Sequence, residues 1–303
     1  MQPLLECVPN FSDGKNAAVV DQLVAAMTSV TGVSCLAHEL DGAHNRCVIT
    51  LAGEPEAVGD AAFQGLAKAI GLIDLNQHVG EHRRMGAMDV CPFVPLGGAD
   101  MDLAIATARR VGERIGTELE VPVFLYAKAA QREDRRILGN VRNKQFEGLK
   151  DLVGSDPDYK PDFGPDQLHP TAGAVGVGAR TFLIAYNINL KTADVAVAKA
   201  ISKLVRERDG GLPRVQAMGF FLDDRNVAQV SMNLLDYNVT SIRRVFDEVA
   251  EKASEAGVEI EESELVGLVP ESALDTETAT HIQLRGFDPD LQVVEARLKA
   301  AGI

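Results

Sequence analysis

The chain has 303 residues, of which 46% are hydrophobic and 24% charged, with 27 glycines and 13 prolines. This composition indicates a globular protein long enough for two domains, and it excludes collagen-like and disordered chains. Acidic residues outnumber basic ones by 44 to 30, and the resulting net charge of −14 argues against binding to nucleic-acid phosphates. The longest apolar runs, such as 215–222, are much shorter than the roughly 20 residues of a membrane span, so we expect a soluble protein with no membrane partner.

The cysteines and the N-terminus indicate the compartment. Cys7, Cys35, Cys47 and Cys91 have the spacing of neither a zinc site nor a dense disulfide framework. We therefore expect four small buried side chains in a reducing cytoplasm. The first residues show no basic stretch followed by a long apolar one, so no secretory signal is expected.

Hydrophobic periodicity predicts alternating strands and helices in the first half of the chain. In chain order these are a strand at 4–8, a helix at 19–27, strands at 33–40 and 47–52, a helix at 55–70, a strand at 88–94, a helix at 100–119, a strand at 121–126, and charged helical segments at 131–138 and 143–153.

The pattern restarts after residues 154–178, which are rich in Gly, Pro and Asp and are interpreted as the connection between two domains. The second half predicts a strand at 181–189, a helix at 192–206, strands at 215–222 and 228–234, a helix at 240–256 and a strand at 258–265. This β-α-β-β-α-β order is that of ferredoxin-like units. We predict an α+β fold of two such subdomains, with sheets covered by helices and the active site between them.

The densest polar chemistry of the first half lies in the loop around Gly80 to Gly86. His78 and His82 are four residues apart, but Gly80 between them disfavours the helix that a zinc pair of this kind requires, so we expect no metal. A histidine beside Glu81 and Arg83 is better suited to proton transfer, because imidazole titrates near neutral pH.

Two further polar segments are candidate binding loops. Residues 173–180 are glycine-rich but precede a predicted strand, which excludes the dinucleotide-binding order of strand, glycines and helix. We interpret them as a loop whose backbone, at Gly178, approaches a flat ligand, with Arg180 as an anion anchor. Residues 41–46 are either a hairpin turn or part of a substrate site.

Long blocks of the sequence strongly resemble the glutamate formiminotransferase family. They are residues 6–16 (ECVPNFSDGKN), 80–93 (GEHRRMGAMDVCPF), 161–165 (PDFGP), 178–190 (GARTFLIAYNINL) and 228–234 (AQVSMNL). The resemblance implies an N-terminal subdomain at 1–178, a C-terminal subdomain at 179–303, and a homodimer. It also implies transfer of the formimino group from N-formimino-L-glutamate to N5 of tetrahydrofolate, with or without a polyglutamate tail, in histidine degradation. The cyclodeaminase to which the animal protein is fused is expected to be absent.

The resemblance places the family's catalytic histidine on His82 and its folate-binding stretch on about 163–172. Together with the glycine-rich segment, the expected folate contacts are Phe163, Gly164, Pro165, His169, Pro170, Thr171, Ala172, Gly178 and Arg180. The expected contacts with the formimino donor are Glu39, Asp41, His44, Asn45, Arg46 and Arg84. Arg83 stands where the family usually has Pro, which leaves fine substrate preference open.

The chemistry of the reaction fits one histidine without a covalent intermediate. His82 is the expected base for the N5 proton and then the acid for the departing nitrogen. Either Glu39 or Asp41 is expected to hold the amidinium, while Arg46, Arg84 and Arg180 meet carboxylates. The alternatives are formyl transfer from N-formylglutamate, an ATP-dependent cyclo-ligase-like reaction on 5-formyltetrahydrofolate, and a folate-binding protein without turnover.

Overall fold

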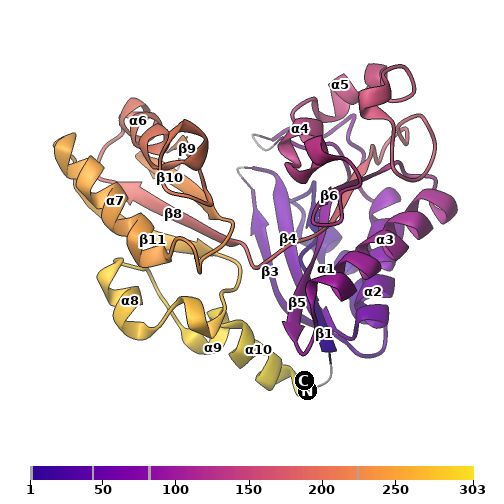
Figure 1. The fold of residues 1–303 in the computed structure, drawn as a ribbon, viewed down its shortest axis with the longest axis horizontal. Helices are drawn as coiled ribbons and strands as arrows, with labels where there is room; N and C mark the ends of the chain where they lie inside the picture. Colours follow the sequence, from indigo (N-terminus) through magenta and orange to yellow (C-terminus); the bar gives the residue numbers. More distant parts are fainter. Residues whose placement is uncertain (1–2, 43, 81–82, 224) are drawn as a thin grey trace. The chain divides into compact units, whose positions relative to one another are not determined.

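The protein divides into two compact units, Met1–Arg180 and Thr181–Ile303, shown in Figure 1. The computed structural model describes residues 3–42, 44–80, 83–223 and 225–303. Among the helices of these described ranges, none combines the length and apolar character that crossing a bilayer requires.

The first unit contains a seven-stranded mixed sheet and five α-helices. Its strands are β1 (Pro3–Cys7), β2 (Asn10–Phe11), β3 (Val33–Asp41), β4 (Arg46–Gly53), β5 (Met88–Gly97), β6 (Val123–Ala127) and β7 (Val175–Ala179). Its helices are α1 (Ala17–Thr28), α2 (Pro55–Ile70), α3 (Met101–Glu118), α4 (Gly139–Arg142) and α5 (Gln145–Leu152), with 3-10 turns η1 (Glu133–Arg136) and η2 (Pro157–Tyr159).

Local sequence signals set the helix boundaries of this unit. The side chain of Asn16 caps α1 by accepting from Ala18 N, and Asp100 caps α3 by accepting from Leu103 N. Pro55 occupies the first turn of α2, where its missing N–H needs no partner. The predicted helix at 55–70 is confirmed at both ends.

Four strands of the first unit have the split βαβ arrangement. β3 pairs with β4, β4 with β1 and β1 with β5, all antiparallel, while α1 and α2 connect them along the chain. Beyond β5 the sheet continues with β7 and β6, both added in parallel. Helices α1, α2 and α3 lie together on one side of the sheet (Figure 1), where alternate strand residues such as Leu5 and Cys7 are fully buried.

The second unit repeats the same four-strand topology on its own. Its strands are β8 (Ile184–Leu190), β9 (Val215–Leu222), β10 (Val227–Leu234) and β11 (Ile260–Val266), in the antiparallel order β11-β8-β10-β9. Its helices are α6 (Val195–Val205), α7 (Ile242–Glu255), α8 (Thr276–His281), α9 (Pro289–Gln292) and α10 (Val294–Ala301), with 3-10 turns η3 (Glu207–Asp209) and η4 (Glu271–Ala273). Buried residues of the sheet, α6 and α7 form its core.

The predicted α+β fold with two helix-covered sheets is confirmed. Cys7, Cys47 and Cys91 are buried, Cys35 is partly exposed and all four are free thiols, so the expectation of four buried side chains is confirmed for three. The charged segment predicted as a helix at 131–138 contains a single 3-10 turn, η1. Helices α8 to α10 follow the last predicted strand and were missing from the sequence interpretation.

The interpretation of 173–180 as a loop, and of 154–178 as an inter-domain connection, is wrong. Both segments fold within the first unit, and residues 175–179 form β7, between β5 and β6. Glycines alternate with buried valines in this strand because side chains from other parts of the unit pack directly against the backbone at the glycine positions. A Cβ on Gly178 would lie 2.6 Å from Cε1 of Tyr126, and one on Gly176 would lie 2.9 Å from Cδ1 of Leu138.

Candidate functional site

The turn between β3 and β4 holds an Asp–His pair. Nδ1 of His44 lies 2.7 Å from Oδ2 of Asp41, and the backbone N–H of His44 donates to Oδ1 at 2.9 Å. Burial alone would raise the pKa of Asp41, but the hydrogen bonds from His44 and the charge of Arg46 lower it to about 2. The carboxylate is therefore ionised and fixes the orientation of the imidazole.

Arg46, at the start of β4, adds a partly buried cation beside this turn. Burial lowers the pKa of its guanidinium, and the negative charges of Asp41, Asp89 and Glu39 act in the opposite direction. The predicted donor-binding residues Glu39, Asp41 and Arg46 are thus electrostatic neighbours.

The segment before His82 lies against the same turn. Nε2 of His78 is 3.0 Å from the carbonyl oxygen of Asn45, and Nδ2 of Asn45 donates to the carbonyl of Val79 at 3.0 Å. Gly80 is required here, because a Cβ at this position would lie 2.5 Å from the carbonyl oxygen of His44. His82 itself, like Glu81, lies outside the described residues.

The segment after His82 is held by a network that the sequence did not reveal. Arg84 is buried and donates to both carboxylate oxygens of Glu147, at 2.8 and 2.6 Å. Its Nε donates to Nδ1 of His78 at 3.1 Å, and the N–H of Phe146 donates to its carbonyl at 3.0 Å. Arg84, predicted to bind a substrate carboxylate, thus has a carboxylate partner within the protein.

Arg83, at the position where the sequence departs from the family, is also anchored. Its guanidinium donates to Oδ1 of Asn143 at 2.6 Å. Asn143 follows α4, so this contact and the Arg84–Glu147 pair tie the residues after His82 to α4 and α5.

The predicted folate stretch joins this segment through the backbone. Ala87 N donates to the carbonyl oxygen of Ala172, and Ala174 N donates to that of Met85, both at 2.9 Å. Leu75 N donates to the carbonyl oxygen of Thr171, also at 2.9 Å. The side chain of Asn76 also donates to the carbonyl of Pro170, at 3.0 Å. Residues on both sides of His82 are thus hydrogen-bonded to the folate stretch.

Two glycines permit this close backbone contact. A Cβ on Gly86 would lie 1.9 Å from the carbonyl oxygen of Ala174, and one on Gly173 would lie 2.2 Å from that of Met85. Asp89, which is 2% exposed, accepts from Met85 N at 2.8 Å and pairs with Arg142. Burial raises the pKa of Asp89, and Arg142 opposes that effect.

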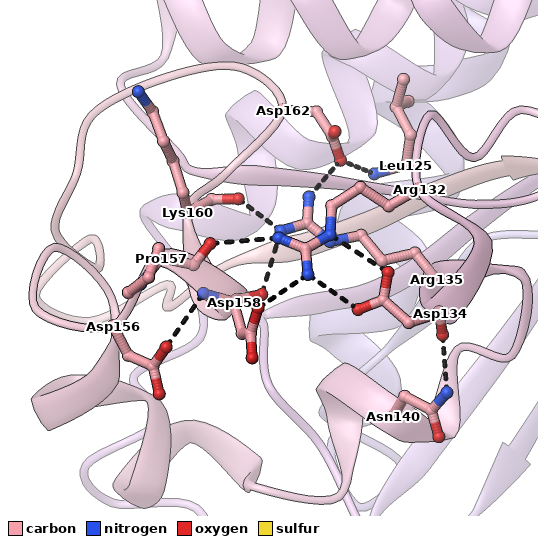
Figure 2. Close-up of polar contacts among 10 residues, drawn as sticks. All are labelled: Leu125, Arg132, Asp134, Arg135, Asn140, Asp156, Pro157, Asp158, Lys160 and Asp162. Atoms are coloured by element: carbon pink, nitrogen blue, oxygen red, sulfur yellow. Dashed lines mark hydrogen bonds and ion pairs between the residues drawn. The ribbon is translucent and has the colours of Figure 1, made fainter.

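The start of the folate stretch is fixed by the buried Arg135, as Figure 2 shows. Its guanidinium donates to Oδ2 of Asp162 at 2.8 Å and to the carbonyl of Lys160 at 2.5 Å. Asp162 also accepts from Leu125 N of β6 at 2.7 Å. The next residue, Phe163, pairs through its carbonyl with Val123 N at 2.9 Å.

The arginine-rich run from 132 to 142 is therefore neutralised internally. Arg132 pairs with Asp134 and Asp158 (Figure 2), Arg136 with Glu133 and Arg142 with Asp89. Among the pairs of this run, those of Arg135 and Arg142 involve a buried carboxylate, whereas the pair of Arg136 is exposed.

The predicted folate contacts Gly178, Arg180 and Gly164 lie at β7 and beside α3. Gly178 lies beneath Tyr126 in β7, and Arg180 N donates to the carbonyl of Phe93 at 3.0 Å at the end of that strand. Gly164, with a φ of +89°, lies against Val121 and α3. Among the described residues there is no group of three His, Cys, Asp or Glu side chains placed to hold a metal ion.

Family models match both units. The N-terminal subdomain of the formiminotransferase domain matches residues 4–180, and a second formiminotransferase domain model matches residues 185–289. The chain belongs to the formiminotransferase family. The segments on either side of His82 and the segment 163–174, which are joined by backbone hydrogen bonds, thus both lie within a formiminotransferase domain.

Curated relatives are similar to this chain over 90% to 98% of its length. The glutamate formimidoyltransferase of Thermoplasma acidophilum is 46% identical over 300 residues, covering 98% of each chain. That of Streptococcus pyogenes is 42% identical over 298 residues, covering 98% of this chain and 99% of the relative. The formimidoyltransferase-cyclodeaminase of Rattus norvegicus is 42% identical, and the match covers 90% of this chain but 51% of that longer protein.

Proposed function

We propose that this protein is a glutamate formimidoyltransferase that moves the formimino group from N-formimino-L-glutamate to N5 of tetrahydrofolate. The observation that carries the proposal is the similarity to two formimidoyltransferases across 98% of the chain. Both family models, which together span most of residues 4–289, support the same activity. Tetrahydrofolate is then a co-substrate, and the reaction requires no metal.

The proposed reaction needs two proton transfers at one carbon centre. The N5 lone pair of tetrahydrofolate attacks the amidine carbon and forms the new C–N bond. His82 takes the N5 proton from the tetrahedral adduct and gives a proton to the nitrogen of glutamate. The bond from that nitrogen to carbon then breaks, which releases L-glutamate and 5-formiminotetrahydrofolate.

The turn between β3 and β4 is the proposed binding place for the formimino group. Asp41, ionised and beside His44, or its neighbour Glu39 balances the charge of the amidinium. Arg46 and Arg180 are proposed to meet the carboxylates of the donor and of the folate tail. Arg84 pairs with Glu147 and His78 and is proposed to hold the residues that flank His82.

The proposed folate site follows residues 163–172. Their support is the backbone contact between Thr171, Ala172 and the residues on both sides of His82. Following the resemblance, we further propose a cytoplasmic homodimer.

The decisive test is a transfer assay without ATP. Purified protein, N-formimino-L-glutamate and tetrahydrofolate are mixed and acidified, and the absorbance of methenyltetrahydrofolate is recorded. We expect product with the wild type and a loss of about 10²- to 10³-fold in kcat for His82→Ala, with folate binding retained. Undiminished turnover by His82→Ala would overturn the role of His82.

Other outcomes identify the alternatives. Product from N-formylglutamate in place of the formimino compound would change the donor. A requirement for ATP would indicate a cyclo-ligase-like reaction, and folate binding without any product would indicate a binding protein.

A further inference from the structure

Asn45 holds together three segments of the first unit that are far apart in the sequence. Its Oδ1 accepts from Gly14 N at 3.0 Å, and its Nδ2 donates to the carbonyl oxygen of Val79 at 3.0 Å. Its own carbonyl oxygen lies 3.0 Å from Nε2 of His78. With a φ of +50°, Asn45 has the left-handed backbone conformation that asparagine adopts more readily than most residues. The turn between β3 and β4 is therefore tied to residues 78–79 through both the side chain and the main chain of one residue.

His78 connects this turn to the far end of the loop that contains His82. Nε of Arg84 donates to Nδ1 of His78 at 3.1 Å, which joins two residues six positions apart. Arg84 is in turn held by Glu147 of α5, at 2.6 Å. The described residues before and after His82 thus belong to one loop, and the imidazole of His78 closes it.

The two contacts select the same tautomer of His78. Nε of an arginine carries a hydrogen and can only donate, so Nδ1 of His78 is an unprotonated acceptor. A carbonyl oxygen can only accept, so Nε2 carries the proton that is donated to Asn45. Both ring nitrogens are therefore engaged within the protein, which distinguishes His78 from a group that transfers protons to a substrate.

We propose that His78 is a positioning residue of the transfer reaction, which holds the loop that contains His82 against the turn between β3 and β4. The inference rests on the proposed function, in which that turn binds the formimino group and His82 moves the protons. The base and the reacting group then belong to separate segments that have to keep one geometry. A displacement of about 1 Å can lower a rate by about 100-fold.

Two variants of His78 separate its hydrogen bonds from its bulk. His78→Leu keeps an apolar side chain of similar size and loses both nitrogens. His78→Gln restores an acceptor for Arg84 and a donor for Asn45, because the amide carries oxygen and nitrogen on one planar carbon, as the ring carries its two nitrogens on Cε1. His38→Leu, at an exposed histidine of β3, is the matched control for the loss of an imidazole.

The measurements are kcat, tetrahydrofolate affinity by titration calorimetry, and thermal unfolding. We expect His78→Leu to lower kcat by about 10- to 100-fold and to leave the affinity for tetrahydrofolate unchanged. We expect His78→Gln to recover most of the lost kcat, and His38→Leu to turn over like the wild type. Undiminished kcat in His78→Leu, or a parallel loss of kcat and folate affinity, would overturn the positioning role.

A double variant tests whether His78 acts through Arg84. If the two side chains form one connection, His78→Leu adds nothing to the effect of Arg84→Met, and the double variant is as slow as Arg84→Met alone. Effects on kcat that multiply would show that the two residues act separately and would contradict the inference.

Nitrogen NMR of the wild type gives a readout that needs no variant. We expect the 15N shifts of His78 to show an unprotonated Nδ1 and a protonated Nε2 at neutral pH, and the opposite tautomer would contradict the inference.

The two proposals fail in different ways. A wild type that transfers the formimino group as fast as His78→Leu contradicts the positioning role alone. A wild type that transfers no formimino group contradicts the proposed function and, with it, the role of His78 in that reaction.

Discussion

Two histidines of the first unit are oriented by opposite kinds of partner. Nδ1 of His44 faces the ionised carboxylate of Asp41 and so carries a proton. Nδ1 of His169 faces two backbone N–H groups and so carries none. The two imidazole rings are thereby given fixed and different hydrogen-bonding directions.

Asp41 makes a testable contribution to acid stability. Its pKa of about 2 in the folded protein is below its ordinary value of 3.8, so the ionised group stabilises the fold above about pH 4. This stabilisation is lost as the pH falls through the folded-state pKa. In Asp41→Asn we expect the deficit in unfolding free energy, relative to wild type, to be largest above pH 4 and to shrink towards pH 2.

Urea unfolding at several pH values measures that deficit. Asp13 is a partly exposed carboxylate of the same unit that accepts from the backbone N–H groups of Lys15 and Asn16, and it provides the control as Asp13→Asn. A deficit of Asp41→Asn that stays constant between pH 6 and pH 2 would contradict the assigned ionisation.

At the scale of elements, the segment that begins the folate stretch depends on one buried cation. Arg135 is 1% exposed, and its partner Asp162 also accepts from the backbone of β6. Removing one partner of a buried pair leaves the other charge without compensation. The segment that begins at Asp162 is therefore coupled to β6 through this pair.

We expect Arg135→Met to lower the unfolding free energy by about 3 kcal/mol, as is typical when a buried ion pair loses one partner. Arg136→Met is the matched control, because its pair with Glu133 is exposed and contributes little. Denaturant unfolding of the two variants measures the difference, and equal stabilities would show that the Arg135 pair does not hold the segment.

Sequence patterns predicted helices and strands well where apolar side chains recur at a regular spacing. They predicted them poorly where glycines interrupt that spacing. Pro55 and the apolar spacing after it predicted α2 correctly, and Val215 to Leu222 predicted β9 at both ends. The strand pattern of β7 is hidden because Gly176 and Gly178 have no side chains. Glycine is needed at these two positions because Leu138 and Tyr126, which are distant in the sequence, pack directly against their backbone. Such contacts depend on the assembled sheet and have no local signal.

The candidate site shows the same division. The resemblance predicted the histidine motif and the folate stretch, and both stay predictions, but nothing in the sequence indicated the hydrogen bond between Ala87 and Ala172 that joins the two segments. Asp89 lay within a recognised block, so its position could have suggested a role. Glu147 is an exposed residue of α5, far along the chain, and nothing in its local sequence indicates the pairing with Arg84. The predicted position of the active site between the two halves stays a prediction.

At the scale of the whole molecule, the two units share one topology but differ in what is added to it. Each contains four antiparallel strands in the split βαβ order with two connecting helices. Among the described residues, the first unit adds β2, β6, β7 and helices α3 to α5, while the second adds three short helices after its sheet. Each unit has its own hydrophobic core.

We expect residues 181–303 to fold when expressed alone, because their core is formed by their own sheet and helices. Cooperative thermal unfolding by circular dichroism and dispersed amide signals in NMR would support this. A fragment with the signals of an unfolded chain would show that its core is insufficient without the first unit.

The place of β7 in the sheet has a consequence for synthesis on the ribosome. β6 pairs in parallel with β7, which is the last strand of its unit to be made and lies between β5 and β6. While residues 128–174 are being synthesised, β6 has no β7 to pair with. Its apolar side chains and unpaired backbone groups can then form non-native contacts. The sheet of the first unit is therefore completed only when the last residues of that unit have been made, and we expect a chain that ends before Val175 to leave the pairing edges of β5 and β6 without this strand.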